Sequence, residues 1–251
     1  MSEHIASQFS DNLDRVESAI AEACRRAGRE RHDVQLMAVS KTYPAATIIE
    51  AARLGLRLFG ENRVQEFAAK QPELTPWRAN GAIAASAVLV HLIGHLQSNK
   101  AAKAVELFDG IDSVDSLRLA RRLDEAAKKL AKRMPVLIEV KLSPEETKEG
   151  LDPESSEAAE LLEALPELGA LDCRGLMTIA PWGAEEAVTR ACFRSLREFR
   201  DRWAAKYPNL KLDVLSMGMS GDFPLAIEEG ATRIRVGTAI FGKRAPYSGP
   251  S

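Results

Sequence analysis

Residues 34–41 read Val34-Gln35-Leu36-Met37-Ala38-Val39-Ser40-Lys41, an apolar and β-prone run that ends abruptly on a lysine. Thr42-Tyr43-Pro44 come next, and Pro44 suits the first turn of a helix, where a backbone N–H is not needed. The run therefore predicts a buried strand followed by a helix. The lysine needs a reason to lie at the end of this strand, because a buried charge without a partner is costly.

The alternation of strand and helix continues to the end of the chain. The predicted strands are continuous apolar runs more often than alternating ones, which is typical of a parallel sheet covered by helices. Eight such units in about 250 residues match a closed (β/α)8 barrel, the TIM barrel of the α/β class. The strands are predicted at residues 34–41, 56–60, 88–94, 110–114, 135–142, 175–179, 212–217 and 232–237.

An additional amphipathic helix precedes the first strand. Apolar residues recur at helical spacing over residues 13–27, with Ser10 or Asp11 placed to cap the start and Gly28 to end the helix. No obvious helix follows the last predicted strand. We therefore expect the N-terminal helix to cover that gap in the ring of helices.

The series of strands and helices predicts a single domain over residues 1–251, because no linker or change of composition interrupts it. The two ends, residues 1–9 and 245–251, are predicted to be flexible. Residues 72–87 contain two prolines and an alanine-rich tail, and the sequence pattern assigns them no element.

The composition is that of an ordinary globular protein, with 34 basic and 36 acidic side chains and a net charge of -2. Neither nucleic acid nor a membrane surface is indicated as a partner. Cys24, Cys173 and Cys192 are odd in number and form no C-x-x-C pair, so buried free thiols are expected. Neither a signal peptide nor an apolar run long enough to span a bilayer is found, which predicts a cytoplasmic protein.

Chemistry-bearing residues follow several of the predicted strands. In a closed parallel barrel the C-terminal ends of all strands open on one face, and active sites lie there. Because the last strand of such a barrel lies beside the first, the end of the sequence becomes a neighbour of the first strand. The residues expected at this face are Lys41, Asn62, His95, Met217 and Gly237.

Two loops at this face have the composition of an anion site. One loop reads Met217-Gly218-Met219-Ser220-Gly221-Asp222, and the other begins Gly237-Thr238. Small residues let backbone N–H groups converge on an anion, and the hydroxyls of Ser220 and Thr238 add donors. Each loop alone is explained equally well by a tight turn. Their pairing after strands seven and eight favours phosphate, because phosphate sites of barrels commonly form there.

Strand alternation places Ile234 and Val236 on one side of the last strand, and Arg233 and Arg235 on the other. If the apolar pair faces the helices, the arginines face the barrel interior. A desolvated guanidinium needs an acceptor, either a barrel carboxylate or an atom of a ligand. The sequence favours neither acceptor.

Beside a phosphate site, Lys41 acquires a chemical reason. A desolvated amine loses its proton more readily, and a neutral amine forms a Schiff base with an aldehyde. A phosphorylated aldehyde fits both features, and pyridoxal 5′-phosphate (PLP) fits them best. The alternative is a lysine that simply extends into solvent.

Other catalytic patterns are weaker. His91 and His95 stand four residues apart, the spacing of a helical metal site, but they belong to a predicted strand and no glutamate follows His91. We therefore expect no metal site. A G-x-S-x-G elbow with a Ser/His/Asp order is not found in the sequence either.

The sequence resembles the pyridoxal phosphate homeostasis protein family, a single-barrel relative of the N-terminal domain of alanine racemase within the fold type III group. The shared motifs run from the first strand to the last, and together they are highly specific. They are Ala38-Val39-Ser40-Lys41-Thr42, Phe59-Gly60-Glu61-Asn62-Arg63-Val64-Gln65-Glu66, His91-Leu92-Ile93-Gly94-His95-Leu96-Gln97-Ser98-Asn99-Lys100, Gly175-Leu176-Met177-Thr178, Leu215-Ser216-Met217-Gly218-Met219-Ser220-Gly221-Asp222 and Arg233-Ile234-Arg235-Val236-Gly237-Thr238-Ala239-Ile240-Phe241-Gly242.

The resemblance implies roles for individual residues. Lys41 is implied to form the Schiff base with PLP, and Arg235 to face the pyridine nitrogen. Three residues are implied to hold the phosphate and three to line the ring pocket. They are Ser220, Gly237 and Thr238 at the phosphate, and Asn62, Ser216 and Met217 at the ring. The motif Gln97-Ser98-Asn99-Lys100 is a family marker that a helix cap and a solvated lysine would also explain.

The resemblance implies a PLP carrier in intracellular vitamin B6 homeostasis. An arginine beside the pyridine nitrogen keeps the ring neutral and makes it a poor electron sink, and the second domain of alanine racemase is not expected here. We expect a monomer or weak dimer that supplies PLP to PLP-dependent apo-enzymes. The alternatives are an amino-acid racemase with Tyr43 as the second base, and a barrel scaffold without a cofactor.

Overall fold

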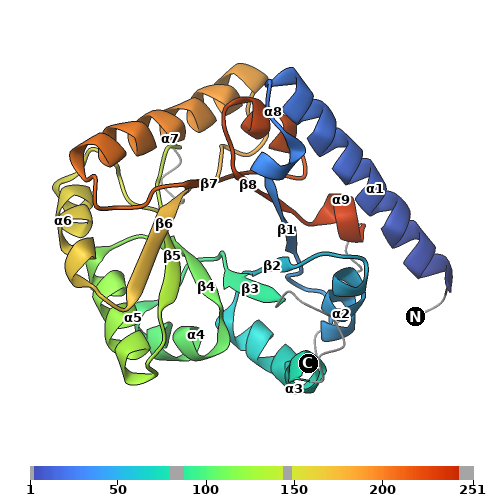
Figure 1. Cartoon of the computed structure of the whole chain (residues 1–251), viewed down its shortest axis with the longest axis horizontal. Helices are drawn as coiled ribbons and strands as arrows, with labels where there is room; N and C mark the ends of the chain where they lie inside the picture. Colours follow the sequence, from blue (N-terminus) through green and yellow to red (C-terminus); the bar gives the residue numbers. More distant parts are fainter. Residues whose placement is uncertain (1–2, 80–87, 144–148, 243–251) are drawn as a thin grey trace.

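The computed structural model describes residues 3–79, 88–143 and 149–242. Within these residues eight parallel strands pair in chain order, and β1 also pairs with β8, so the sheet closes into a barrel. Helices surround the barrel (Figure 1), which confirms the predicted (β/α)8 fold. The strands are β1 (Gln35–Val39), β2 (Leu58–Glu61), β3 (Leu89–Leu92), β4 (Gly110–Val114), β5 (Met134–Glu139), β6 (Leu171–Met177), β7 (Val214–Met219) and β8 (Arg233–Val236).

Two of the helices that follow strands begin at serine caps. Ser116 and Ser155 each accept a hydrogen bond from a backbone N–H of the first turn, which satisfies a donor that the helix itself leaves unpaired. The helices are α1 (Glu3–Arg26), η1 (Arg31–Asp33), α2 (Ala45–Arg53), α3 (Val64–Ala79), η2 (Ser98–Lys100), α4 (Ala101–Leu107), α5 (Leu117–Lys129), α6 (Ser156–Ala164), η3 (Leu165–Glu167), α7 (Glu186–Lys206), α8 (Phe223–Glu228) and α9 (Thr238–Phe241).

Helix α1 lies along α8 and α9 and covers the flank of the barrel next to β8, as the sequence predicts (Figure 1). The helix begins at Glu3, ahead of the predicted caps, because Phe9 is buried and stacks on Phe241 with ring centroids 5.3 Å apart. The side-chain amide of Asn12 donates to the carbonyl of Ile240 at 3.0 Å. The short helix α9 does follow the last strand, so α1 packs over a helix at this position and does not replace one.

Two elements extend into residues that the sequence pattern does not assign to them. Helix α3 continues through Pro72 and Pro76, which are exposed, because Leu74 on its inner side is buried. Packing of that side outweighs the lost backbone hydrogen bonds. Strand β6 begins earlier than predicted, since the polar residues Asp172 and Arg174 interrupt the apolar run. Residues 80–87, part of the stretch to which the sequence pattern assigns no element, lie outside the described residues. The same is true of residues 245–251, which are predicted to be flexible.

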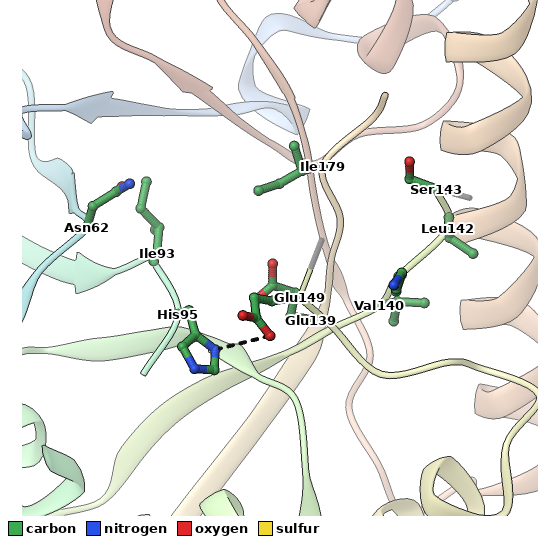
Figure 2. A pocket seen from close by; sticks show the side chains of 11 residues that line it. Asn62, Ile93, His95, Glu139, Val140, Leu142, Ser143, Glu149 and Ile179 are labelled. Atoms are coloured by element: carbon green, nitrogen blue, oxygen red, sulfur yellow. Dashed lines mark ion pairs between the residues drawn. The ribbon is translucent and has the colours of Figure 1, made fainter. Parts of the chain in front are cut away.

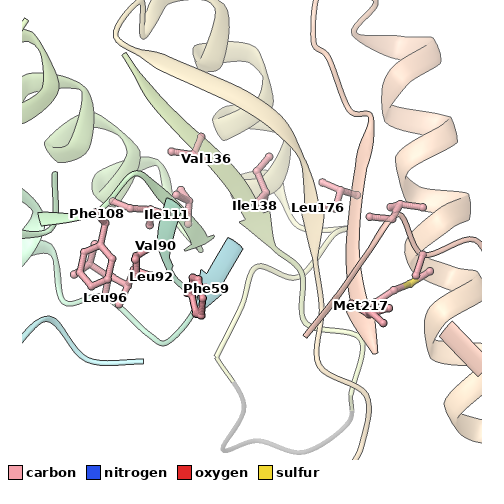
Figure 3. Close-up of a cluster of buried hydrophobic side chains, with 14 of the residues drawn as sticks. Phe59, Val90, Leu92, Leu96, Phe108, Ile111, Val136, Ile138, Leu176 and Met217 are labelled. Carbon is pink, nitrogen blue, oxygen red and sulfur yellow. The ribbon is translucent and has the colours of Figure 1, made fainter. Parts of the chain in front are cut away.

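The main apolar core lies between the strands and the helices. Figure 3 shows one part of it, where Phe59, Val90 and Ile111 of three neighbouring strands meet Phe108 next to α4. Ile234 and Val236 of β8 belong to the same cluster. The apolar pair of β8 therefore faces the helices, and its arginines face the barrel interior, as the alternation of the strand predicts.

A network of buried charged side chains crosses the barrel interior, nearer than Arg235 to the N-terminal ends of the strands. The guanidinium of Arg233 donates to Asp112 of β4 at 2.9 Å and to the side chain of Gln35 at 3.0 Å. Nδ1 of His91 lies 2.8 Å from the other oxygen of Asp112. Burial raises the pKa of Asp112, but the charges of His91 and Arg233 outweigh it and hold this pKa at about 2. The sequence leaves two acceptors open for the arginines of β8, a barrel carboxylate or an atom of a ligand. For Arg233 the acceptor is a barrel carboxylate.

The cysteines and the helices agree with two further expectations. Cys24, Cys173 and Cys192 are free and buried, and burial raises the pKa of Cys173 to about 12. Within the described residues, no helix is both long enough and apolar enough to cross a bilayer.

Replacing Asp112 with asparagine is expected to lower the free energy of unfolding at neutral pH by about 3–5 kcal/mol, because Arg233 stays buried without its carboxylate. The folded pKa of Asp112 lies below the unfolded one, so its stabilisation is present above about pH 4 and is lost as the pH falls towards about 2. The acid-induced loss of stability should therefore be shallower in Asp112→Asn. Urea denaturation at several pH values measures both effects.

The matched control is Glu106→Gln, which removes an exposed ion pair with Lys103 and should leave stability nearly unchanged. Equal stability of Asp112→Asn and the wild-type chain would contradict a structural role for the buried network.

Candidate functional site

Lys41 lies half-buried in the turn that follows β1, at the C-terminal mouth of the barrel. Parallel pairing of β1 with β8 sets Ala38 beside Val236. The backbone beyond these residues is also close, since a Cβ on Gly237 would lie 3.2 Å from the carbonyl oxygen of Val39. The Lys41 turn and the loop after β8 are therefore neighbours, as barrel closure predicts.

A buried polar network fixes the backbone on both sides of Lys41. Before it, the hydroxyl of Ser40 donates to Oε1 of Glu61 at 2.6 Å. Nζ of Lys70 donates to the same oxygen at 2.8 Å and to the Ser40 carbonyl at 3.1 Å. After it, the backbone N–H of Thr42 donates to Glu66, which also accepts from Lys70 at 3.0 Å. One ammonium group thus connects both flanks of the turn.

This network supports an unusual backbone conformation. Thr42 has a φ of 69°, in the left-handed region that β-branched residues rarely adopt. Such strain persists only where the surroundings hold the backbone in place. Burial raises the pKa of Glu61, and Lys70 and the Ser40 hydroxyl oppose that rise. The turn is consequently fixed by groups on α3, and Lys41 projects from a constrained backbone.

The loops after β7 and β8 meet at the Ser220 side chain. Its hydroxyl oxygen accepts hydrogen bonds from the backbone N–H groups of Gly237, at 3.2 Å, and Ala239, at 3.4 Å. Gly218, next to last in β7, has a φ of 88° and no room for a Cβ beside Ala226, so the end of this strand packs closely against α8. Backbone donors and a hydroxyl therefore converge, which is the arrangement predicted for an anion site.

Arg235 is buried inside the barrel above the ion network. Nη1 donates to the hydroxyl of Ser216 at 2.9 Å, and Nη2 donates to the carbonyl of Thr178 at 2.8 Å. Burial lowers its pKa, and the carboxylates of Asp112 and Glu139 oppose the change. In contrast to Arg233, its hydrogen bonds in the described structure go to neutral acceptors, and its positive charge reaches the barrel mouth.

The remaining residues that are predicted for the site differ in their burial and in their contacts. Asn62 is half-buried after β2, and Thr238 is exposed at the start of α9. The side chain of Met217 lies in the apolar core cluster (Figure 3). The hydroxyl of Tyr43 donates to the carbonyl of Gly242 at 3.0 Å, and its ring lies 5.0 Å from that of Phe241.

The chain has close relatives of nearly equal length. The family model described as alanine racemase, N-terminal domain, matches residues 12–245. The pyridoxal phosphate homeostasis protein of Pseudomonas aeruginosa is 43% identical over 98% of this chain and 99% of its own length. The protein of the same name from Escherichia coli K12 is 39% identical over 94% of this chain and 97% of its own. This chain belongs to the pyridoxal phosphate homeostasis protein family.

Solved structures agree with this assignment. PipY of Synechococcus elongatus with PLP bound is 46% identical and has a TM-score of 0.77. The match covers 93% of this chain and 100% of PipY. An alanine racemase of Clostridium difficile is only 15% identical, with a TM-score of 0.69 over 96% of this chain and 58% of its own. The second likeness shows the fold alone.

The two histidines that stand four residues apart in the sequence, His91 and His95, lie in different surroundings. His91 lies inside the barrel against Asp112, whereas Nδ1 of His95 lies at the mouth, 3.2 Å from Asp115 and 3.7 Å from Glu149. The family marker Gln97-Ser98-Asn99-Lys100 forms the 3-10 turn η2 that leads into α4.

Several residues of the mouth are not predicted from the sequence. Glu61, Glu66 and Lys70 lie in or next to a quoted motif, but only the fold shows that they meet Ser40 and Thr42. The spacing of Glu66 and Lys70, four residues apart on a helix, was the available signal. A cavity on the opposite side of the mouth contains Glu139, which no motif indicates (Figure 2).

Lys70→Met is expected to lower the free energy of unfolding by about 3 kcal/mol, because Glu61 stays buried without its cation. The backbone N–H of Thr42 should exchange faster with solvent, since Glu66 loses the ammonium that holds it. The double variant Glu61→Gln/Lys70→Met should recover most of the lost stability. Chemical denaturation and amide hydrogen exchange measure these effects.

Lys103→Met, at an exposed position of α4, is the matched control for loss of a lysine. Unchanged protection of the Thr42 amide in Lys70→Met would contradict the assigned role of the network.

Proposed function

We propose that this chain holds PLP on Lys41 and supplies it to other proteins. The observation that carries the proposal is the meeting, at the barrel mouth, of the fixed Lys41 turn with the backbone donors around Ser220. The names of the relatives and the PLP bound in PipY support the same conclusion. When bound, PLP supplies an aldehyde that condenses with a primary amine.

The residues of the mouth fit the cofactor group by group. The N–H groups of Gly237 and Ala239 now share the Ser220 hydroxyl, and a phosphate with more acceptor oxygens suits these donors. The exposed hydroxyl of Thr238 is available on the same turn. We assign Ser220, Gly237 and Thr238 to the phosphate.

The ring would lie between the two sides of the barrel mouth. Arg235, which keeps its proton at all ordinary pH values, would face the pyridine nitrogen as a donor and leave that nitrogen unprotonated. Asn62 and Ser216 would line the ring with polar groups. Met217, whose side chain is in the core, would contribute its backbone. A neutral pyridine withdraws electrons weakly, which favours holding the cofactor over carbanion chemistry.

The racemase alternative finds less support in the arrangement of Tyr43. A second base must present its oxygen to the reacting carbon, but the Tyr43 hydroxyl donates to the Gly242 carbonyl and its ring packs on Phe241. The likeness to alanine racemase concerns the fold alone. We therefore favour the carrier.

The partners follow from the carrier function. PLP-dependent apo-enzymes would receive the cofactor, and the chain would act in the cytoplasm as a single domain and as a monomer or weak dimer. Neither nucleic acid nor a membrane is expected as a partner, because the net charge is only -2.

Lys41→Ala is expected to abolish covalent attachment of PLP. After incubation with PLP and reduction with borohydride, mass spectrometry should find one pyridoxyl group on the peptide that contains Lys41, and none at that position in the variant. Lys103→Ala, at an exposed position, should behave as the wild-type chain. Attachment at another lysine with equal yield would overturn the assignment, and rapid, Tyr43-dependent exchange of amino-acid α-protons in deuterated water would overturn the carrier function.

Ser220→Asp is expected to weaken PLP binding by about 100-fold or more, because a carboxylate would repel the phosphate and occupy its donors. Binding of pyridoxal, which lacks the phosphate, should change by less than about 3-fold. Equilibrium titration of both compounds measures the difference. An equal effect on the two compounds would remove the phosphate from this place.

A further inference from the structure

A cavity of about 260 Å³ opens at the barrel mouth across from the Ser220 loops. The segments after β2, β3, β5 and β6 form its walls, and Figure 2 shows their side chains around a common space. Part of the wall is apolar, with Ile93 and Ile179 on opposing segments. The polar part comprises Asn62, His95, Glu139, Lys141, Ser143 and Glu149, so the wall contains one lysine beside its two carboxylates. The cofactor residues assigned above, apart from Asn62, lie outside this lining.

Glu139 is the deepest charged group of the cavity. The residue ends β5 and is only 6% exposed, yet its Oε2 has no hydrogen-bond partner within the described part of the chain. Burial raises the pKa of this carboxyl to about 7, against the attraction of Arg235 and with the repulsion of Asp115 and Glu149. An unpaired buried acceptor costs stability unless something supplies a donor. The cavity places open space beside it.

The rim of the cavity is also acidic. Asp115 and Glu149 both lie against Nδ1 of His95, and the three groups are within 4.8 Å of one another. Ligand atoms of a small divalent ion lie closer together, about 3–3.5 Å in a tetrahedral site, and such an ion would leave most of the cavity unfilled. The volume, the apolar walls and the acidic groups together fit an organic cation better than a metal ion.

We propose that this cavity binds the ammonium group of a small primary amine, with Glu139 as its counter-ion and Ile93 and Ile179 beside its carbon chain. An ammonium supplies the donors that Oε2 lacks and a charge that the carboxylate attracts. The binding does not depend on PLP, so it goes beyond the proposed function. Through Asn62 the amine would lie next to the region assigned to the ring.

The test uses the chain without PLP at about pH 8.5, where Glu139 is ionised and alkylammonium groups remain charged. Propylammonium chloride is titrated, and binding is followed by NMR shifts of backbone amides around residues 139–142. Saturable shifts at these amides are expected. 1-Propanol has the same length without the charge and should bind at least about 10-fold more weakly.

Two variants locate the counter-ion. Glu139→Gln keeps the shape of the side chain and should weaken amine binding by at least about 10-fold. Glu149→Gln, at the exposed rim, should weaken it by no more than about 3-fold. Circular dichroism confirms that both variants are folded.

Three results would overturn the proposal: equal binding of propanol and propylammonium, an unchanged affinity in Glu139→Gln, or shifts of the same amides by zinc chloride but not by propylammonium. The last result would assign the rim to a metal. Lys41→Ala should bind the amine as the wild-type chain does, so failure of this proposal leaves the PLP function standing, and the reverse also holds.

Discussion

Parallel pairing of β1 with β8 is the constraint on which the site depends. Without this ladder the barrel would be an open sheet, and the residues after β1 would lie at one edge, far from those after β8. With it, the Gly237 backbone lies against Val39, and a lysine from near the start of the chain faces donors from near its end. Helix α1 supports the closure from outside, because it packs on α8 and α9 beside this seam (Figure 1).

Closure also creates an interior in which charged groups must find partners. Burying an isolated charge is costly, and the structure meets this cost at two levels. Lower in the barrel, Arg233 is bonded to Asp112, whose other oxygen meets His91. Beside the mouth, Lys70 joins Glu61 to the Ser40 backbone. These networks use their charges internally, so they position the backbone and leave other groups to contact ligands.

The sequence predicts the features that depend on local pattern and loses those that depend on what meets in space. The series of apolar runs and turns locates all eight strands approximately, and β4 is found at its observed bounds although it contains Asp112 and Ser113. Helix α3 is underestimated because burial of Leu74 overrides two prolines, a tertiary effect. The sequence places Lys41 and the Ser220 loop at the same face correctly, because the strand ends of a barrel share one face. Glu139 is missed because it lies in no quoted motif, and its cavity forms only where four separate segments of the chain meet.

The two sides of the barrel mouth differ in charge. This difference links the two proposed ligands, PLP and a small primary amine. On the side of β8 and β1, Arg235 is bonded to neutral acceptors, so its positive charge acts together with Lys41 and the Gly237 donors to favour an anionic, phosphorylated group. On the side of β3 and β5, Glu139 and the rim carboxylates favour a cation. Asn62 lies between the two sides. With both proposed ligands bound, Glu139 would attract the amine and Arg235 the phosphorylated aldehyde, so the charges of the mouth would direct each ligand to its own side.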